Sequence, residues 1–305
     1  MKLKVLGSAA GGGYPQWNCN CPMCAGVRTG SIDATARTQS SIAVSSDGID
    51  WVLFNTSPDI LTQIQQCGIL QPGRSLRDTG IRSIVLLDAQ IDHTTGLLML
   101  REHQKALPVW CTGPVREDLS EGNPLFRVLS HYCTVDWHEI ALDGETMRIP
   151  GADTVSFQAL PLTSNAPPYS PHRDQPVTGD TLGMLMHDTA SDKRIFYAPG
   201  LGEMEGHVWA AMNEADIVLV DGTMWTDDEM ISRGASAKTA RSMGHLPQTG
   251  PGGMIEWLDK LPASTRKILI HINNTNPVLQ NDGKERQHLE AHGIELAEDG
   301  LEIDC

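Results

Sequence analysis

Asp92 and His93 lie in a short polar loop that follows an apolar run, Ile84–Leu87, with the length of a buried strand. Thr94 or Thr95 can cap a helix behind this pair, since leucines follow at helical spacing. A strand, a loop and a helix N-terminus in this order form a common ligand-binding position in α/β proteins. A carboxylate beside an imidazole suits a divalent metal, whereas a helix cap beside a surface histidine is the simpler alternative.

Two other apolar runs of strand type end at residues of the same kinds. Asp221 follows Ile217–Val220, and His271 follows Lys267–Ile270. If these strands share a sheet with the first one, their carboxyl ends meet at one edge. We therefore expect one site that gathers four candidate metal ligands and catalytic residues, namely Asp92, His93, Asp221 and His271.

His245 adds a candidate catalytic acid or base to this set. It stands in Gly244–Pro247, ahead of a predicted helix that ends at Leu258. The dipole at a helix N-terminus disfavours a protonated imidazole. The sequence therefore predicts that His245 is neutral and relays protons.

Three cysteines, Cys19, Cys21 and Cys24, form a Cys-x-Cys-x-x-Cys cluster in a turn-rich loop at about residues 14–30. Three thiolates this close together can bind one tetrahedral zinc ion and leave one vertex for a distant ligand. The fourth ligand is open: Asn274, another histidine or a residue of a partner subunit would each serve. A redox pair or a coincidental thiol cluster is the alternative to structural zinc.

Two loops complete the set of candidate functional segments. Gly7–Gly13 lacks the lysine and the serine or threonine of a phosphate-binding P-loop, so we interpret it as a flexible lead into the cysteine cluster. Thr163–His172 is long and proline-rich, as lids and binding segments often are. Tyr169 and His172 are its candidate substrate contacts, although an ordinary surface loop would look the same.

Composition limits the classes of function. The chain has 305 residues and a formal net charge of −15, without a basic block, which argues against nucleic-acid partners. No apolar stretch approaches the roughly 20 residues that span a membrane, and no signal-peptide pattern is visible, so we expect a cytoplasmic protein. With no break in composition, we expect one α/β domain over residues 1–305.

The periodicity of apolar residues predicts an alternation of strands and helices. We expect strands over 2–6, 39–44, 49–54, 82–87, 108–111, 155–162, 181–186, 193–197, 217–220 and 267–270. Helices are expected over 59–67, 94–103, 203–213 and 285–291, with short helices in 114–132.

The motif Asp88-Ala-Gln-Ile-Asp-His93 resembles the His-x-His-x-Asp-His signature of the metallo-β-lactamase superfamily. Gly244-His245 and His271 are similar to motifs of its ribonuclease Z and phosphonate-pathway phosphodiesterase branches. The resemblance implies an αββα sandwich of two mixed sheets flanked by helices. It also implies a structural zinc ion at the cysteine loop, although the phosphodiesterase branch has a histidine where this chain has Asn274.

The chain departs from that signature where the superfamily binds its first metal ion. Asp88 and Gln90 replace two histidines, Thr163–Asn165 stands in place of a third, and Gly200 stands where a bridging aspartate is expected. Two imidazoles and one carboxylate survive, in His93, His271 and Asp92, with Asp221 as an extra or substitute ligand. This is the ligand set of non-haem Fe(II) oxygenases, although zinc bound there could still support hydrolysis.

Several longer motifs resemble the protein B family of pyrroloquinoline quinone (PQQ) biosynthesis. They are Gly7–Gly13, Pro15–Cys21, Asn55–Asp59, Gln90–Gly96, Tyr197–Gly200, Val220–Thr223 and His271–Pro277. The resemblance implies an iron-dependent oxygenase that hydroxylates the tyrosine ring of a Glu–Tyr-derived intermediate from a precursor peptide. A mononuclear metal hydrolase and a non-catalytic PQQ carrier or transport protein are the alternatives. Manganese, copper or zinc would also fit the ligands, and the zinc loop could join two subunits.

Overall fold

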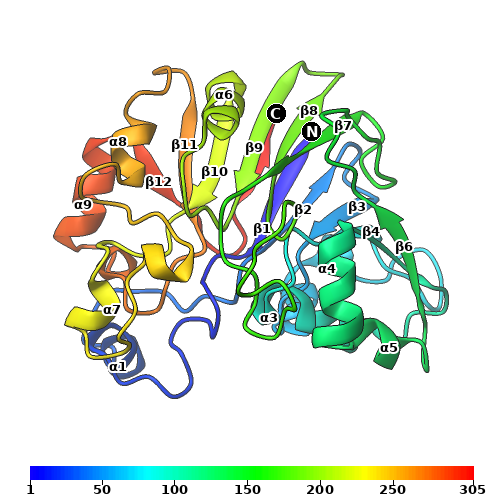
Figure 1. The fold of residues 1–305 in the computed structure, drawn as a ribbon, viewed down its shortest axis with the longest axis horizontal. Coiled ribbons are helices and arrows are strands. Elements are labelled where there is room, and N and C mark those ends of the chain that lie inside the picture. The colour runs from blue at the N-terminus through cyan, green and yellow to red at the C-terminus, as the bar shows by residue number, and fades with distance from the viewer.

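Two β-sheets face each other at the centre of the computed structural model, which describes residues 1–305 (Figure 1). The first sheet has seven strands in the order β13-β1-β2-β3-β4-β5-β6, and the second has six in the order β12-β11-β10-β9-β8-β7. The strands of the first sheet are β1 (Lys2–Gly7), β2 (Ser41–Ser45), β3 (Trp51–Phe54), β4 (Ile81–Val85), β5 (Leu107–Cys111), β6 (Val135–Glu139) and β13 (Glu302–Asp304). The strands of the second are β7 (Val155–Pro161), β8 (Leu182–Asp188), β9 (Lys193–Ala198), β10 (Ile217–Asp221), β11 (Arg266–Ile270) and β12 (Ile294–Leu296).

The central core lies between the two sheets, because each sheet turns one apolar face inward. Phe54 from β3 packs against Phe157 and Tyr197 of the other sheet, with ring centroids 6.0 and 5.9 Å apart. All three side chains are fully buried. Burial of this apolar surface holds the two sheets together and fixes the relative position of the loops at their ends.

Helices cover the outer face of each sheet, as we predicted for an αββα sandwich (Figure 1). On the first sheet lie α2 (Ile60–Gln66), α3 (Ile91–Thr94), α4 (Gly113–Glu117) and α5 (Leu125–Leu129), with short 3-10 and π turns between them. On the second lie α1 (Pro22–Thr29), α6 (Gly206–Glu214), α8 (Met254–Leu258) and α9 (Lys284–Ala291), and α7 (Glu229–Ser232) follows β10. The fold prediction is therefore confirmed.

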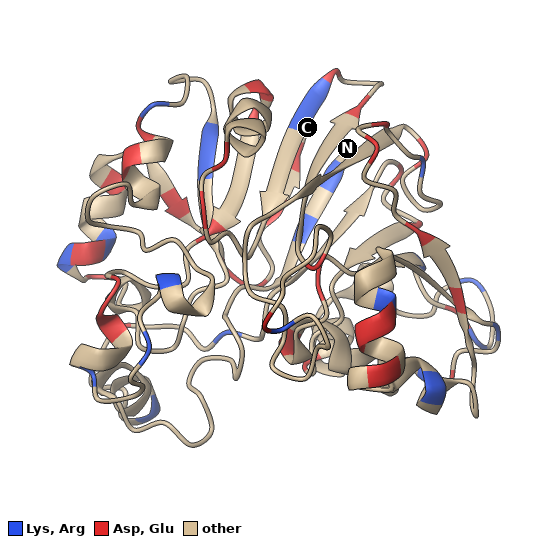
Figure 2. Ribbon diagram, viewed as in Figure 1, with Lys and Arg blue, Asp and Glu red and all other residues tan.

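Figure 2 marks the positions of Lys and Arg at scattered points along the ribbon, on strands as well as on helices and loops, with no long continuous run of them. No helix combines the length and the apolar character needed to cross a membrane.

The strands that carry the candidate site run parallel to their neighbours. β4 pairs with β3 and β5 in one sheet, while β10 pairs with β9 and β11 in the other. The site strands do not all share one sheet, so the condition under which we expected their ends to converge is not met. The carboxyl ends of β4 and of β10 and β11 come from different sheets, and the packing of the sheets brings them together.

Some elements escaped the sequence prediction or begin elsewhere. Strands β6, β12 and β13 were not expected, and neither were the helices α1 and α7. The helix expected from Thr94 begins at Ile91 and gives way to a 3-10 turn, Thr95–Leu100. Asp92 and His93 therefore lie within the first helical turn and not in the loop before it.

Candidate metal centre

Asp92, His93 and His271 form the innermost part of the site. The Oδ2 atom of Asp92 lies 3.3 Å from Nε2 of His271 and 3.7 Å from Nε2 of His93. Both histidines are buried, and Nε2 of His93 has no hydrogen-bond partner. A buried imidazole nitrogen without a partner, facing a carboxylate and a second imidazole, suits a site for one divalent cation.

His93 is oriented by Asp88, one of the two residues that replace histidines of the superfamily signature. Its Nδ1 atom lies 2.8 and 2.9 Å from the two carboxylate oxygens of Asp88. A carboxylate accepts only, so Nδ1–H donates and Nε2 is left as the nitrogen that faces Asp92. Burial opposes the charge on His93, but Asp88 and Asp92 outweigh it and raise its pKa to about 9.

His271 reaches the site through an unusual backbone conformation. Its φ angle is +61°, in the left-handed region, which costs a non-glycine residue about 1–2 kcal/mol. The next residue, Ile272, donates its backbone N–H to Ser8 at 2.9 Å and so holds the chain in place after the turn. Burial lowers the pKa of His271 below its usual value, so the side chain is neutral near pH 7.

Asp92 is held against the glycine-rich loop. A Cβ atom on Gly11 would lie 3.2 Å from Oδ2 of Asp92, so the backbone of the loop lies directly against the carboxylate. The prediction that Gly7–Gly13 merely leads to the cysteines was therefore incomplete, since this segment forms a wall of the site. Burial alone would raise the pKa of Asp92, but His93 and His271 hold it below its usual value.

Asp221 is fully engaged by donors of the protein. Its Oδ1 accepts from the backbone N–H and the hydroxyl of Thr223, at 2.9 and 2.6 Å. Its Oδ2 accepts from the N–H of Leu201 at 2.9 Å and lies 2.7 Å from Nδ1 of His245. With both oxygens so occupied and no exposed surface, Asp221 orients neighbouring side chains better than it could ligate a metal.

His245 joins the site, but not from a helix N-terminus. It follows a 3-10 turn, Arg241–Met243, and α8 begins only at Met254, so the prediction of a dipole effect was wrong. Burial disfavours the charged imidazole, but Asp221 outweighs burial and raises the pKa of His245. The ring of His245 stacks on that of His271, with centroids 5.4 Å apart, and its Nδ1 is bound to Asp221.

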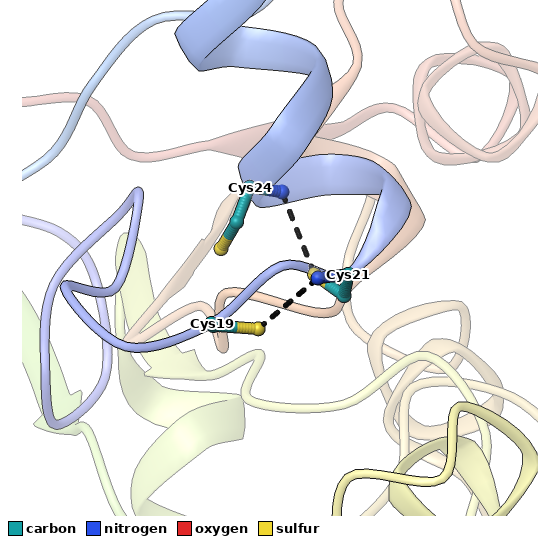
Figure 3. A group of neighbouring side chains, drawn as sticks. All are labelled: Cys19, Cys21 and Cys24. Atoms are coloured by element: carbon teal, nitrogen blue, oxygen red, sulfur yellow. Dashed lines mark hydrogen bonds between the residues drawn. The ribbon is translucent and has the colours of Figure 1, made fainter.

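The cysteine cluster lies where the loop meets α1. Figure 3 shows Cys19, Cys21 and Cys24 around one region, with backbone N–H groups donating to the sulfur atoms of Cys19 and Cys21 at 3.4 Å. Cys21 is the N-cap of α1, and burial raises the pKa of its thiol to about 11 in the metal-free chain, so a bound zinc ion would have to displace its proton. Asn274 lies beside the cluster, with its side-chain nitrogen 3.3 Å from Sγ of Cys24 and its backbone oxygen 3.7 Å from Sγ of Cys21.

Comparison with known proteins agrees with this architecture. The profile of the beta-lactamase superfamily domain matches residues 50–272. Coenzyme PQQ synthesis protein B of Azoarcus sp. strain BH72 is 68% identical over 301 residues, which cover 99% of both chains. The protein of the same name from Methylobacillus flagellatus is 59% identical over 304 residues, again 99% of both chains. The chain belongs to the coenzyme PQQ synthesis protein B family.

Solved structures support the same assignment. The zinc-bound crystal structure of PqqB from Methylobacterium extorquens has a TM-score of 0.90 at 35% identity and covers 100% of both chains. A diphosphatase of the PhnP family, at 19% identity, has a TM-score of 0.69 over 99% of this chain and 96% of its own, and shows the fold alone.

Within this family fold, the residues that replace superfamily histidines are bonded to the protein. Asp88 accepts from His93, and Gln90 donates its side-chain N–H to the backbone oxygen of Asn165 at 2.9 Å. The side-chain N–H of Asn165 in turn donates to the backbone of Ser242 at 2.9 Å. The positions that bind one metal ion elsewhere in the superfamily therefore tie the loops of the site to each other.

The proline-rich loop contacts the segment that carries Asp88 and Gln90. The hydroxyl of Tyr169 donates to the backbone oxygen of Ala89, beside the metal centre. His172 lies farther out, where Nε2 is 3.1 Å from the exposed carboxylate of Glu117. Tyr169 is thus placed next to the site, whereas His172 is engaged on the surface.

Two partners in the site could not be read from the sequence. Asp88 is the orienting acceptor for His93, and Thr223 contacts Asp221, His245 and His271. The motif Val220–Thr223 indicated that this strand end belongs to the site. Only the structure shows that the hydroxyl of Thr223 lies between the imidazoles of His245 and His271.

Proposed function

We propose that this protein acts in PQQ biosynthesis as a mononuclear iron-dependent oxygenase. Its substrate would be a tyrosine ring in a Glu–Tyr-derived intermediate from a precursor peptide. The convergence of Asp92, His93 and His271 carries the proposal, because two imidazoles and one carboxylate leave open positions on a bound Fe(II). Iron in such a setting supplies the activation of dioxygen that the hydroxylation of an aromatic ring needs.

The chemistry of the replaced ligands supports a single metal ion. Superfamily hydrolases use two ions to hold a bridging hydroxide. Here Asp88 is bonded to His93, and Gln90 to the backbone of Asn165, so the donors for a second ion are missing or engaged.

The remaining polar residues have roles that follow from their contacts. The pair formed by His245 and Asp221 can hold a proton at the imidazole, since the carboxylate stabilises the charged form. Asp88 and Asp221 fix the orientation of the imidazoles. The loop that carries Tyr169 is bonded to the backbone of Ala89, next to Asp88, and in this position it would limit the access of water to the site.

Mass spectrometry of a reaction under ¹⁸O₂ tests the proposal. The Fe(II)-loaded protein, a Glu–Tyr-derived peptide and an added reductant such as ascorbate should give a product that contains one ¹⁸O atom per hydroxylation. The other oxygen atom leaves as water, and the reductant supplies two electrons. His93→Ala and His271→Ala should abolish the product, whereas His187→Ala, which changes a histidine bonded to Asp192 on the surface, should not.

Zinc hydrolysis is the second candidate, since the PqqB structure from Methylobacterium extorquens contains Zn²⁺. A zinc-bound water next to the His245–Asp221 pair could attack a peptide or an ester. Equal turnover with zinc in the absence of oxygen would favour this reaction over the oxygenase. Tight binding of PQQ without turnover under any of these conditions would favour a carrier.

A further inference from the structure

The hydroxyl of Thr223 lies at the centre of a buried hydrogen-bonded group. Its Oγ1 atom is 2.6 Å from Oδ1 of Asp221, 2.9 Å from Nδ1 of His271 and 3.1 Å from Nδ1 of His245. Thr223 is only 2% exposed, so water does not compete for these contacts. One hydroxyl therefore joins the innermost histidine to the His245–Asp221 pair.

The donor and acceptor roles follow from the chemistry of the groups. A hydroxyl has one proton, and the carboxylate of Asp221 can only accept it. The lone pairs of Thr223 are then left for the two imidazoles, so His271 must donate from Nδ1–H. In a neutral imidazole this leaves Nε2 without a proton, and Nε2 is the atom that lies 3.3 Å from Oδ2 of Asp92.

The backbone holds Thr223 without help from its side chain. Its N–H donates to Asp221 at 2.9 Å, and its carbonyl accepts from the N–H of Asn273 at 2.9 Å and the side chain of Asn276 at 3.2 Å. These asparagines belong to the same loop as His271, so the loop fixes the threonine and the histidine together. Removal of the hydroxyl alone should leave this backbone in place.

We propose that Thr223 is a positioning residue that fixes His271 as the Nδ1–H tautomer and so directs Nε2 to the metal. The idea rests on the proposed metal-binding role of His271, but not on the oxygenase reaction. Without the hydroxyl, Nδ1–H of His271 loses its acceptor inside the protein. The imidazole can then adopt the other tautomer or rotate, and either change weakens its bond to a metal.

Two measurements test this role, and the first needs no variant. Long-range ¹H–¹⁵N NMR of the Zn²⁺-loaded protein reports which nitrogen of His271 carries the proton, because without a metal ion the Asp92 carboxylate can itself accept a proton from Nε2. His271 in the native chain should show protonated Nδ1 and unprotonated Nε2. A protonated Nε2 in the native chain would overturn the proposal.

The second measurement is a titration with Co²⁺, followed by its visible absorption, after Zn²⁺ has filled the cysteine cluster. Thr223→Val keeps the shape without the hydroxyl and should lose about 10–100-fold in affinity, with an altered spectrum. Thr223→Ser should retain native affinity within about threefold, since it keeps the hydroxyl. Thr265→Val changes a buried threonine whose hydroxyl contacts only the backbone of Ala215, at 3.4 Å, and should bind Co²⁺ as the native chain does.

The outcomes separate this proposal from the metal site itself. Native affinity in Thr223→Val, together with weak binding in His271→Ala, would exclude the positioning role and keep the site. Native affinity in His271→Ala would exclude His271 as a metal ligand. This result would contradict both the proposed metal site and the positioning role of Thr223. If Thr223→Val does not fold, the NMR measurement on the native chain still decides.

Discussion

Asp88 shows how one substitution changes the role of a position in a metal site. Where the superfamily has a ligating histidine, this chain has a carboxylate that accepts from Nδ1–H of His93 at 2.8 Å. An outer carboxylate of this kind fixes the tautomer of the histidine and makes its other nitrogen a better donor to a metal.

Asp88→Asn should therefore weaken metal binding about 10–100-fold, because the amide is a weaker acceptor without charge. The loss should be greatest at high pH, where His93 is unprotonated in both proteins. Titration with Co²⁺ measures the change, and Asp136→Asn, which alters an exposed Asp–His pair with His138, should have no effect. Equal affinity of the native and Asp88→Asn proteins would show that Asp88 does not support His93.

The protonation of His93 predicts how metal affinity depends on pH. Its pKa of about 9 in the metal-free protein lies above its ordinary value, so near neutral pH a proton occupies the ligand. Metal must displace this proton, and apparent affinity should fall by up to tenfold for each pH unit below about 9. Calorimetry in buffers of different ionisation enthalpy should detect the released proton. Constant affinity between pH 6 and 8.5 would contradict this assignment.

At the scale of elements, the sequence predicted where the strands end along the chain better than how these ends converge in space. The apolar runs before Asp221 and His271 are buried strands, as their length indicated, and the residues after them do reach one site. Their meeting with Asp92 depends on the packing of one sheet on another, which periodicity along a chain does not contain. The superfamily resemblance supplied that information.

The elements that the sequence analysis did not predict give weak or misleading signals in the sequence. β12 and β13 are only three residues long, and they lie at sheet edges, as β6 does; no residue of β6 is fully buried, and its short apolar–polar alternation was not taken as a strand. Helix α1 begins at Pro22 inside the cysteine cluster, where proline and polar residues suggested a turn. His245 was assigned to a helix N-terminus because the 3-10 turn before it leaves no pattern in the sequence.

The contact between the glycine-rich loop and Asp92 gives a test at this scale. Gly11→Ala would place a methyl group 3.2 Å from the carboxylate of Asp92, which is shorter than an ordinary van der Waals contact. The substitution should therefore displace Asp92 by a few tenths of an ångström. We expect metal affinity to fall about tenfold while the protein stays folded, since binding sites tolerate little misplacement. Gly68→Ala meets no atom within 4 Å and is the matched control. Equal Co²⁺ affinity of Gly11→Ala and Gly68→Ala would exclude this effect.

At the scale of the whole molecule, the two candidate metal sites are connected through one loop. Asn274 contacts the cysteine cluster, and His271, three residues earlier on that loop, lies in the inner site. A zinc ion held by Cys19, Cys21 and Cys24 would therefore fasten the loop that positions His271. This supports structural zinc over a redox role for the cluster.

Cys24→Ser should lower the melting temperature by several degrees and weaken Co²⁺ binding at the inner site, because a structural zinc contributes directly to folding. Cys133→Ser changes a buried cysteine outside the cluster and should leave the affinity of the inner site unchanged. Removal of zinc from the native chain by a chelator should reproduce the effect of Cys24→Ser. No change in melting temperature after complete removal of zinc would contradict a structural role.

The number of metal ions bound per chain tests the mononuclear site most directly. The native chain, its cysteine cluster filled with Zn²⁺, is dialysed anaerobically against Fe²⁺ and analysed by mass spectrometry for both metals. We predict one Fe²⁺ per chain, with none in His93→Ala or His271→Ala and one in His187→Ala. Two Fe²⁺ per chain, or one Fe²⁺ retained without His93 and His271, would contradict a single site formed by Asp92, His93 and His271.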